Sequence, residues 1–115
     1  MEAIRLAVLG LNQGAKAARD AAASERFDLA AVAGMGPQAQ AVAAELGAPL
    51  YEDYQELLES VVLDGVVIAL PNGLHLPAVK AALAVGIKHL LVEKPIADTE
   101  EDARMIIDAC DQAGA

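Results

Sequence analysis

Cysteine is almost absent from this sequence: Cys110 is the single one in 115 residues. No disulfide can form within the chain, so we expect a reducing, cytoplasmic setting. No apolar run approaches the roughly 20 residues that a membrane span needs. The apolar segment from Ile4 to Leu9 is too short, and too poorly flanked by positive charge, for a signal peptide. We therefore expect no membrane partner.

Aromatic and basic residues are also scarce. Aromatics make up 3% of the chain, and 8 Lys and Arg face 17 Asp and Glu, giving a net charge of −9. Nucleic acids and anionic membranes need clustered Lys and Arg, so neither is an expected partner, and the acidity is interpreted as solubility. We predict no metal site. With 56% hydrophobic residues, the core must consist of Ala, Val, Leu and Ile, which suits helices packed closely on a sheet.

Short apolar segments alternate with helical stretches along the whole chain. We expect strands at 4–9, 28–33, 49–51, 66–70 and 89–92, and helices at about 13–24, 37–46, 54–61 and 76–85, with a last helix after Asp98 or Thr99. This alternation predicts a parallel sheet with right-handed crossovers. Strands that are apolar throughout indicate cover on both faces. The predicted fold is a single α/β domain over 1–115, a three-layer, doubly wound, Rossmann-like sheet of about five strands.

Two helices have a clear expected inner face. In the helix that starts near Pro37 and stops at Gly47, the expected inner residues are Ala39, Val42, Ala43 and Leu46. In the last helix they are Ala103, Ile106, Ile107 and Cys110, with Glu101 and Asp102 as acids of a capping box.

The loop after the first strand is a candidate phosphate loop. In a doubly wound sheet, ligands bind beyond the carboxyl ends of the strands, where the strand order reverses. The residues expected to lie along a pyrophosphate there are Gly10, Leu11, Asn12, Gln13, Gly14 and Ala15. The usual fingerprint has Gly at the first, third and sixth of these positions, so Asn12 departs from it, although Asn tolerates left-handed angles. A plain strand-to-helix turn is the alternative.

The end of the second strand lacks the usual ribose-binding signal. NAD-binding domains carry an acid here, and NADP-binding domains carry a neutral residue plus Arg. This chain has Gly34, Met35 and Gly36, and no Lys or Arg occurs between Phe27 and Val79. Backbone donors of Gly34 and Gly36 favour a phosphate. The alternative is a glycine turn with no ribose role.

Two further segments end strands at the same edge. Leu70 ends the fourth strand, and Pro71, Asn72 and His75 follow it. We expect all four along the cofactor, although packing is the simpler role for His75.

Glu93, Lys94 and Pro95 follow the last strand. The proline favours an extended Lys94 at the strand tip, where its ammonium is placed to stabilise charge during hydride transfer. A solvated ion pair is the alternative.

Together these segments resemble the N-terminal domain of the Gfo/Idh/MocA oxidoreductases. Ala7 to Ala18 is similar to the family's phosphate loop, and 44–47 with 51–58 to its second helix and the segment that follows. Residues 71–75 are similar to its Pro-Asn-x-x-His motif. Residues 86–97 match its Gly-Lys-His-Val-x-x-Glu-Lys-Pro-x-Ala block, with Ile87 inserted.

The resemblance implies an NAD or NADP cofactor and an active-site lysine at Lys94. Glu93 and Pro95 would then position that lysine and approach the nicotinamide, with Asn72 and His75 beside them. His89 is expected to be structural. The departures at Asn12 and Gly34 bear on cofactor affinity and on the choice between NAD and NADP.

The resemblance also implies a C-terminal substrate domain, which we expect to be absent from this chain. Hydride transfer needs a closed pocket and a proton partner, so we predict no turnover by these 115 residues alone and a small-molecule substrate only with the second domain. The strand at 89–92 becomes an exposed edge, which predicts a homo-oligomer. Two alternatives remain: a stand-alone dinucleotide-binding regulatory module, and a fold that keeps no binding.

Overall fold

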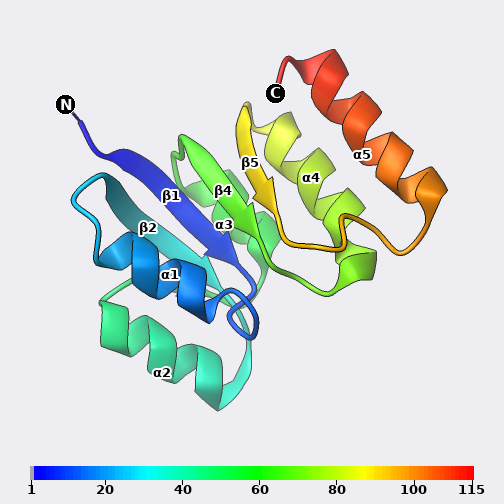
Figure 1. Ribbon diagram of the computed structural model, residues 1–115. Coiled ribbons are helices and arrows are strands. Elements are labelled where there is room, and N and C mark those ends of the chain that lie inside the picture. The colour runs from blue at the N-terminus through cyan, green and yellow to red at the C-terminus, as the bar shows by residue number, and fades with distance from the viewer. Residues whose placement is uncertain (1) are drawn as a thin grey trace.

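The computed structural model describes residues 2–115. Five strands, five α-helices and one short 3-10 helix follow one another in this region (Figure 1). In chain order they are β1 (Ile4–Leu9), α1 (Ala15–Ala22), β2 (Phe27–Ala33), α2 (Gly36–Leu46), β3 (Leu50–Tyr51), α3 (Tyr54–Ser60), β4 (Gly65–Ile68), η1 (Asn72–Leu74), α4 (His75–Ala84), β5 (His89–Val92) and α5 (Glu100–Ala113).

The strands form one parallel sheet in the order β3-β2-β1-β4-β5. The chain adds β2 and β3 on one side of β1, then returns to add β4 and β5 on the other side. The strand order therefore reverses between β1 and β4, and the loops at their carboxyl ends diverge there. This confirms the predicted doubly wound α/β fold.

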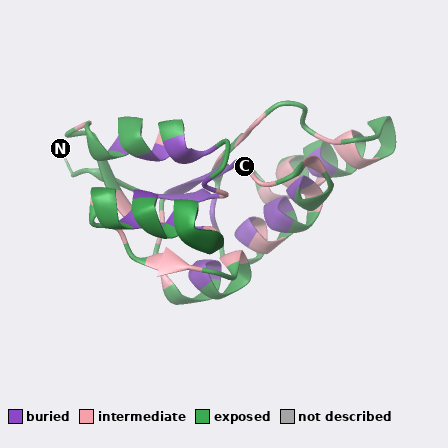
Figure 2. Ribbon diagram, turned by 90° about the horizontal axis from the view of Figure 1, so that it is seen from below, coloured by how far each residue is buried: buried purple, intermediate pink, exposed green. Residues whose placement is uncertain are grey.

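Helices cover both faces of the sheet. Val8, Val32 and Val67 belong to a core shared with α1 and α2. Their neighbours Ala7 and Val66 belong to a second core shared with α3, α4 and α5. Successive strand residues point to opposite faces, so the sheet is the middle of three layers. Figure 2 shows the buried residues on the inward sides of the helices.

The cover is incomplete at β5, where the expectation of two covered faces is wrong. Leu90 and Val92 pack toward the α4 side. Leu91, which points to the other face, is 62% exposed. The helices on that face, α1 and α2, lie over β1 and β2, so they leave β5 bare (Figure 1).

The last helix also buries less than its sequence pattern predicts. Ile106 is buried, whereas Ile107 is 52% exposed, so its assignment to the inner face is wrong. Ala103 and Cys110 are half-buried. The reason is that α5 packs against the helix α4 (Figure 1), and a helix surface covers a narrower stripe than a sheet does. Thr99 is the N-cap, because its side chain accepts a hydrogen bond of 3.0 Å from the Asp102 N–H.

Candidate functional site

The loop between β1 and α1 is folded tightly against the end of β4. Gly10 has φ +95°, a value that side chains rarely tolerate. A Cβ on Gly10 would lie 2.5 Å from the carbonyl oxygen of Ala69, and one on Gly14 would overlap the Gly10 carbonyl oxygen. Gly10 is therefore required by the close approach of the loop to Ala69 after β4, and Gly14 by the tightness of the loop itself, which confirms the predicted tight turn.

The rest of this loop presents polar groups above a buried anchor. Leu11 is buried, and its carbonyl oxygen accepts a hydrogen bond of 2.9 Å from the Gln38 side chain on α2. Asn12 and Gln13 are exposed. Asn12 does not have a positive φ, so the loop is formed without the left-handed backbone we expected it to tolerate. Gly14 is the N-cap of α1 and supplies no side-chain hydrogen bond to the first turn.

Two adjoining hollows run along the carboxyl edge of the sheet. The central hollow, of about 310 Å³, is lined by Gly10, Leu11, Asn12, Ala33, Gly34, Met35, Gln38, Ala39, Glu52, Tyr54, Ala69, Leu70, Pro71 and Leu74. The outer hollow, of about 320 Å³, is lined by Asn12, Gln13, Ala69, Leu70, Pro71 and Asn72. They share residues of the β1 loop and of the segment after β4, so they form one continuous crevice at the point where the strand order reverses.

Most of the predicted cofactor residues meet in this crevice. The loop after β1, the end of β2 and the segment after β4 all contribute to it. Sequence reasoning missed Glu52, Gln38 and Tyr54. Glu52 directly follows β3, so its position after a strand was a usable signal. Gln38 and Tyr54 lie within helices, and their place in the hollow depends on how α2 and α3 pack.

The end of β2 has a packing reason for its missing acid. The Gly34 N–H donates a hydrogen bond of 3.0 Å to the Tyr51 carbonyl oxygen, so it is not the free donor we expected for a phosphate. A Cβ on Gly34 would lie 3.0 Å from the Cβ of Ala39 and 3.3 Å from that of Leu11. Contacts this short force the neighbouring side chains to move, so any larger residue is disfavoured here.

His75 is buried and links two loops. It is 1% exposed; its Nε2 lies 2.8 Å from the Leu70 carbonyl oxygen, and its Nδ1 lies 3.0 Å from that of Ile96. It lines neither hollow. The structure therefore gives His75 the packing role that sequence reasoning favoured, and the ring joins the segment after β4 to the segment after β5.

Lys94 lies at the same edge of the sheet, outside both hollows. The Glu93 N–H donates a hydrogen bond of 2.9 Å to Ile68 and continues the β4–β5 pairing by one residue. Lys94 is exposed, forms no ion pair with any other residue of 2–115, and is joined to Pro95 by a cis peptide bond. The lysine is thus set at the tip of β5, beside the end of β4, with its ammonium open to solvent.

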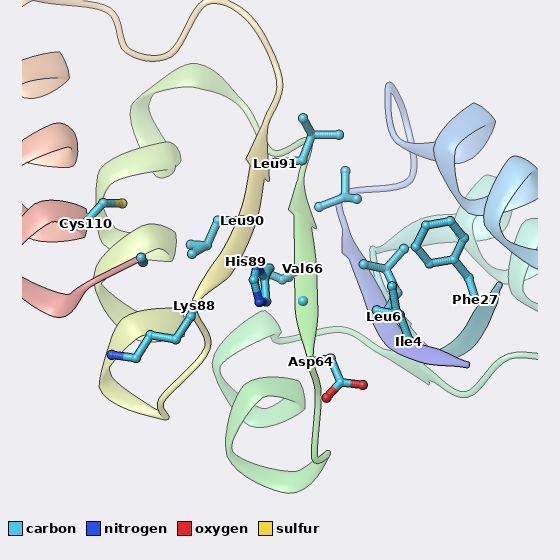
Figure 3. A pocket seen from close by; sticks show the side chains of 13 residues that line it. Ile4, Leu6, Phe27, Asp64, Val66, Lys88, His89, Leu90, Leu91 and Cys110 are labelled. Carbon is cyan, nitrogen blue, oxygen red and sulfur yellow. The ribbon is translucent and has the colours of Figure 1, made fainter. Parts of the chain in front are cut away.

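A larger hollow lies away from the carboxyl edge. It measures about 900 Å³ and lies around β5. Figure 3 shows Leu91, His89 and Lys88 on one side and Ile4 and Phe27 on the other. Val66, Leu90 and Cys110, which belong to the core on the α4 and α5 side, also line it. We call it the β5 groove. It extends to the amino ends of the strands and is mainly apolar. It lies away from the carboxyl edge, where doubly wound sheets bind dinucleotides, so it is not assigned as the cofactor site.

Neither a metal site nor a membrane helix is found in the described region. Residues 2–115 contain no group of three or more His, Cys, Asp or Glu placed to hold a metal ion. Within the same residues, each helix is too short or too polar to span a membrane.

A family profile described as an oxidoreductase family with an NAD-binding Rossmann fold, that of Gfo/Idh/MocA, matches residues 4–115. The chain belongs to this family. The match covers the β1 loop, the crevice and the segment around Lys94, so the resemblance inferred from the sequence motifs is confirmed. The family assignment identifies the chain as an NAD-binding domain of the oxidoreductase type.

Individual Gfo/Idh/MocA proteins agree with this assignment. D-xylose 1-dehydrogenase (NADP(+)) 2 from Haloferax volcanii is 40% identical over 103 residues, which cover 88% of this chain and 31% of that protein. The WlbA dehydrogenase of Bordetella pertussis, solved with NADH and UDP-GlcNAcA, superposes with TM-score 0.87 at 29% identity over 98% of this chain and 35% of that one. Scyllo-inositol dehydrogenase of Lactobacillus casei, solved with NAD(H) and scyllo-inositol, superposes with TM-score 0.89 at 26% identity over 98% of this chain and 34% of that one. The chain thus spans about a third of the length of the relatives it matches.

Proposed function

We propose that this chain is the nucleotide-binding part of an NAD(P)-dependent oxidoreductase that acts on CH–OH groups of sugars, polyols or related small molecules. The observation that carries the proposal is the continuous crevice at the switch point between β1 and β4, bordered by the glycine turn at Gly10. Crevices of this kind are where doubly wound sheets bind dinucleotides. The substrate class rests on the family, whose members here include a xylose and an inositol dehydrogenase.

The residues of the crevice fit a dinucleotide. The Gly10 turn holds the backbone of the β1 loop against Ala69, at the border of the central hollow. Gly14 begins α1 without a side-chain cap, which leaves first-turn N–H groups for a pyrophosphate. Met35 and Leu74 give the central hollow apolar surface for a base, and Asn72 lines the outer hollow, which we propose for the nicotinamide end. Bound there, the nicotinamide supplies the hydride chemistry.

Lys94 is our candidate for the catalytic residue. Its ammonium is placed to donate a hydrogen bond to a substrate oxygen and so stabilise charge as the hydride moves. Glu93 continues the pairing of β5 with the end of β4 and so sets the place of the lysine that follows it. His75 is a positioning residue, since it holds Ile96 to Leu70. Any form of the protein that oxidises a polyol is expected to lose about 10²- to 10⁴-fold in kcat on Lys94→Met; an unchanged kcat would overturn this role.

Cofactor binding by these 115 residues is the direct test. Titration with NADH, followed by nicotinamide fluorescence, is expected to show saturable binding. Asn12→Asp places a negative charge beside the proposed pyrophosphate site and is expected to weaken binding by about tenfold or more. Gln112→Glu makes the same change of charge on α5, outside both hollows, and is expected to leave binding within about twofold. Absence of saturable binding of NADH and NAD would refute the proposal.

A second candidate function is a dinucleotide-binding module that regulates a partner without catalysis. It is favoured by the position of Lys94 outside both hollows, which separates the binding residues from the proposed catalytic one. Under both candidates we propose no turnover by the 115 residues alone. If the purified chain oxidised sugars or polyols, that result would exclude both the non-catalytic regulatory module and the proposed inactivity of the 115 residues.

We also propose self-association through β5. Within the described residues β5 pairs with β4 alone, and the β5 groove beside it is apolar and open (Figure 3). Asp64 and Lys88 also line the groove and give it one charge of each sign, which permits a second copy of this chain to pair opposite charges across it. A cytoplasmic location is proposed from the single cysteine; cell fractionation tests it, and recovery outside the cytoplasm would refute it.

A further inference from the structure

The central hollow has a distinct charge. No Lys or Arg occurs between Phe27 and Val79, a stretch that includes α2, β3 and α3. Of the residues that line the hollow, Glu52 is the charged one. A dinucleotide with an extra phosphate on its adenosine ribose therefore meets a carboxylate here and no cation.

Glu52 lies next to the position where NAD-binding domains usually carry their ribose acid. Ala33 and Tyr51 are paired in the parallel ladder of β2 and β3, and the following N–H, that of Gly34, donates to the Tyr51 carbonyl oxygen at 3.0 Å. The residues that come next on the two strands, Gly34 and Glu52, are thus neighbours at the carboxyl edge. Both line the central hollow.

An acid at Gly34 itself is disfavoured by packing. Its Cβ would lie 3.0 Å from the Cβ of Ala39 and 3.3 Å from that of Leu11. Leu11 and Ala39 are buried and hold the β1 loop against α2, so they cannot move aside freely. Glu52 has no such restriction. It is exposed, and its carboxylate makes no hydrogen bond or ion pair with the rest of the described chain.

We propose that Glu52 takes the place of the missing ribose acid and makes this chain select NAD(H) over NADP(H). The inference rests on the proposed cofactor site. An ionised carboxylate accepts hydrogen bonds from the ribose hydroxyls of NAD, whereas it repels a 2′-phosphate. Similarity to relatives does not decide the preference, because the family members compared above include both an NADP dehydrogenase and NAD(H)-bound enzymes.

The test compares NADH and NADPH titrations of the 115-residue chain and its variants. The unaltered chain is expected to bind NADH about tenfold or more tightly than NADPH. Glu52→Gln keeps the shape of the side chain and removes its charge. It is expected to lower the ratio of the NADPH to the NADH dissociation constant by about fivefold, mainly through tighter NADPH binding. Glu59→Gln, the same change at an exposed position of α3 outside the hollow, is expected to leave the ratio within about twofold.

A variant that is expected to gain affinity for NADPH provides a second test of the proposal. Met35 is 73% exposed and lines the same hollow, so Met35→Arg supplies the missing cation and is expected to tighten NADPH binding by about tenfold. The preference for NADH is also expected to shrink at high salt, because an exposed carboxylate is screened.

Equal affinity of the unaltered chain for both cofactors, or an unchanged ratio in Glu52→Gln, would overturn the role of Glu52 while leaving the cofactor site intact. Failure to bind either cofactor would instead overturn the proposed function on which this inference depends.

Discussion

His75 and Ile96 are 21 residues apart in the sequence, yet the imidazole Nδ1 of the first lies 3.0 Å from the carbonyl oxygen of the second. The other ring nitrogen lies 2.8 Å from the carbonyl oxygen of Leu70. Both partners are carbonyl oxygens, so a ring nitrogen that bonds to either of them is the donor. This buried ring ties the turn after β4 to the turn that holds Lys94.

The His75 link predicts a large effect on stability. His75→Ala leaves a cavity and removes the partner of two backbone carbonyls, so the free energy of unfolding is expected to fall by about 2–4 kcal/mol. His89→Ala is the matched control, because His89 is exposed on β5, and its effect is expected to stay within about 0.5 kcal/mol. Urea denaturation followed by circular dichroism measures both. Equal effects of the two variants would contradict the structural role of His75.

The glycine turn after β1 predicts a second effect. Gly10→Ala places a methyl group 2.5 Å from the Ala69 carbonyl oxygen at φ +95°, so we expect a loss of about 2 kcal/mol or more and loss of NADH binding. Gly73→Ala is the control, since its new Cβ would be no closer than 3.6 Å to the Asp98 carboxylate. Thermal unfolding and NADH titration distinguish the two. A stable Gly10→Ala variant that binds NADH normally would show that the tight turn is not required.

The bare face of β5 predicts how the chain associates. Leu91→Glu puts a charge on an exposed apolar position beside the β5 groove and is expected to shift the chain toward the monomer. Val62→Glu changes another exposed apolar residue, one that is 81% exposed and lies outside this groove, so association should persist. Sedimentation equilibrium over a range of concentrations reports the outcome. A chain that is monomeric throughout would rule out self-association by this edge.

The ion pair between Arg19 on α1 and Glu45 on α2 predicts that the stability of the chain depends on pH. Arg19 donates hydrogen bonds of 2.9 and 3.2 Å to the Glu45 carboxylate, and these hold the pKa of Glu45 below its ordinary value. Its stabilising effect is therefore present above the unfolded pKa and is lost as the pH falls through the folded one. Glu45→Gln should be less stable than the unaltered chain at about pH 7, and the difference should be smaller at about pH 3. Thermal unfolding at both values measures this; a difference that persists undiminished in acid would mean that another contact is responsible.

The order and type of the elements were predictable from the sequence. The predicted bounds of β1 and β5 match the observed ones, and α2 ends at the predicted glycine. Apolar strands, helical stripes and glycine or proline stops are local properties, and they specify which segments become strands or helices before any long-range contact forms. The motifs then indicated the carboxyl edge, because parallel strands bring their ends to one side.

Only the tertiary structure decided how these segments share space. The sequence pattern placed Ile107 inside, but packing of α5 on α4 leaves Ile107 exposed. It left open whether His75 packs or lines the cofactor, and the turn after β5 encloses the ring. The sequence alone also gave no reason why position 34 has a glycine where an acid is usual, or why Glu52 lies beside Gly34. Both depend on distances between β1, α2 and β3, and such distances follow from how side chains fill the interior rather than from the periodicity of any one segment.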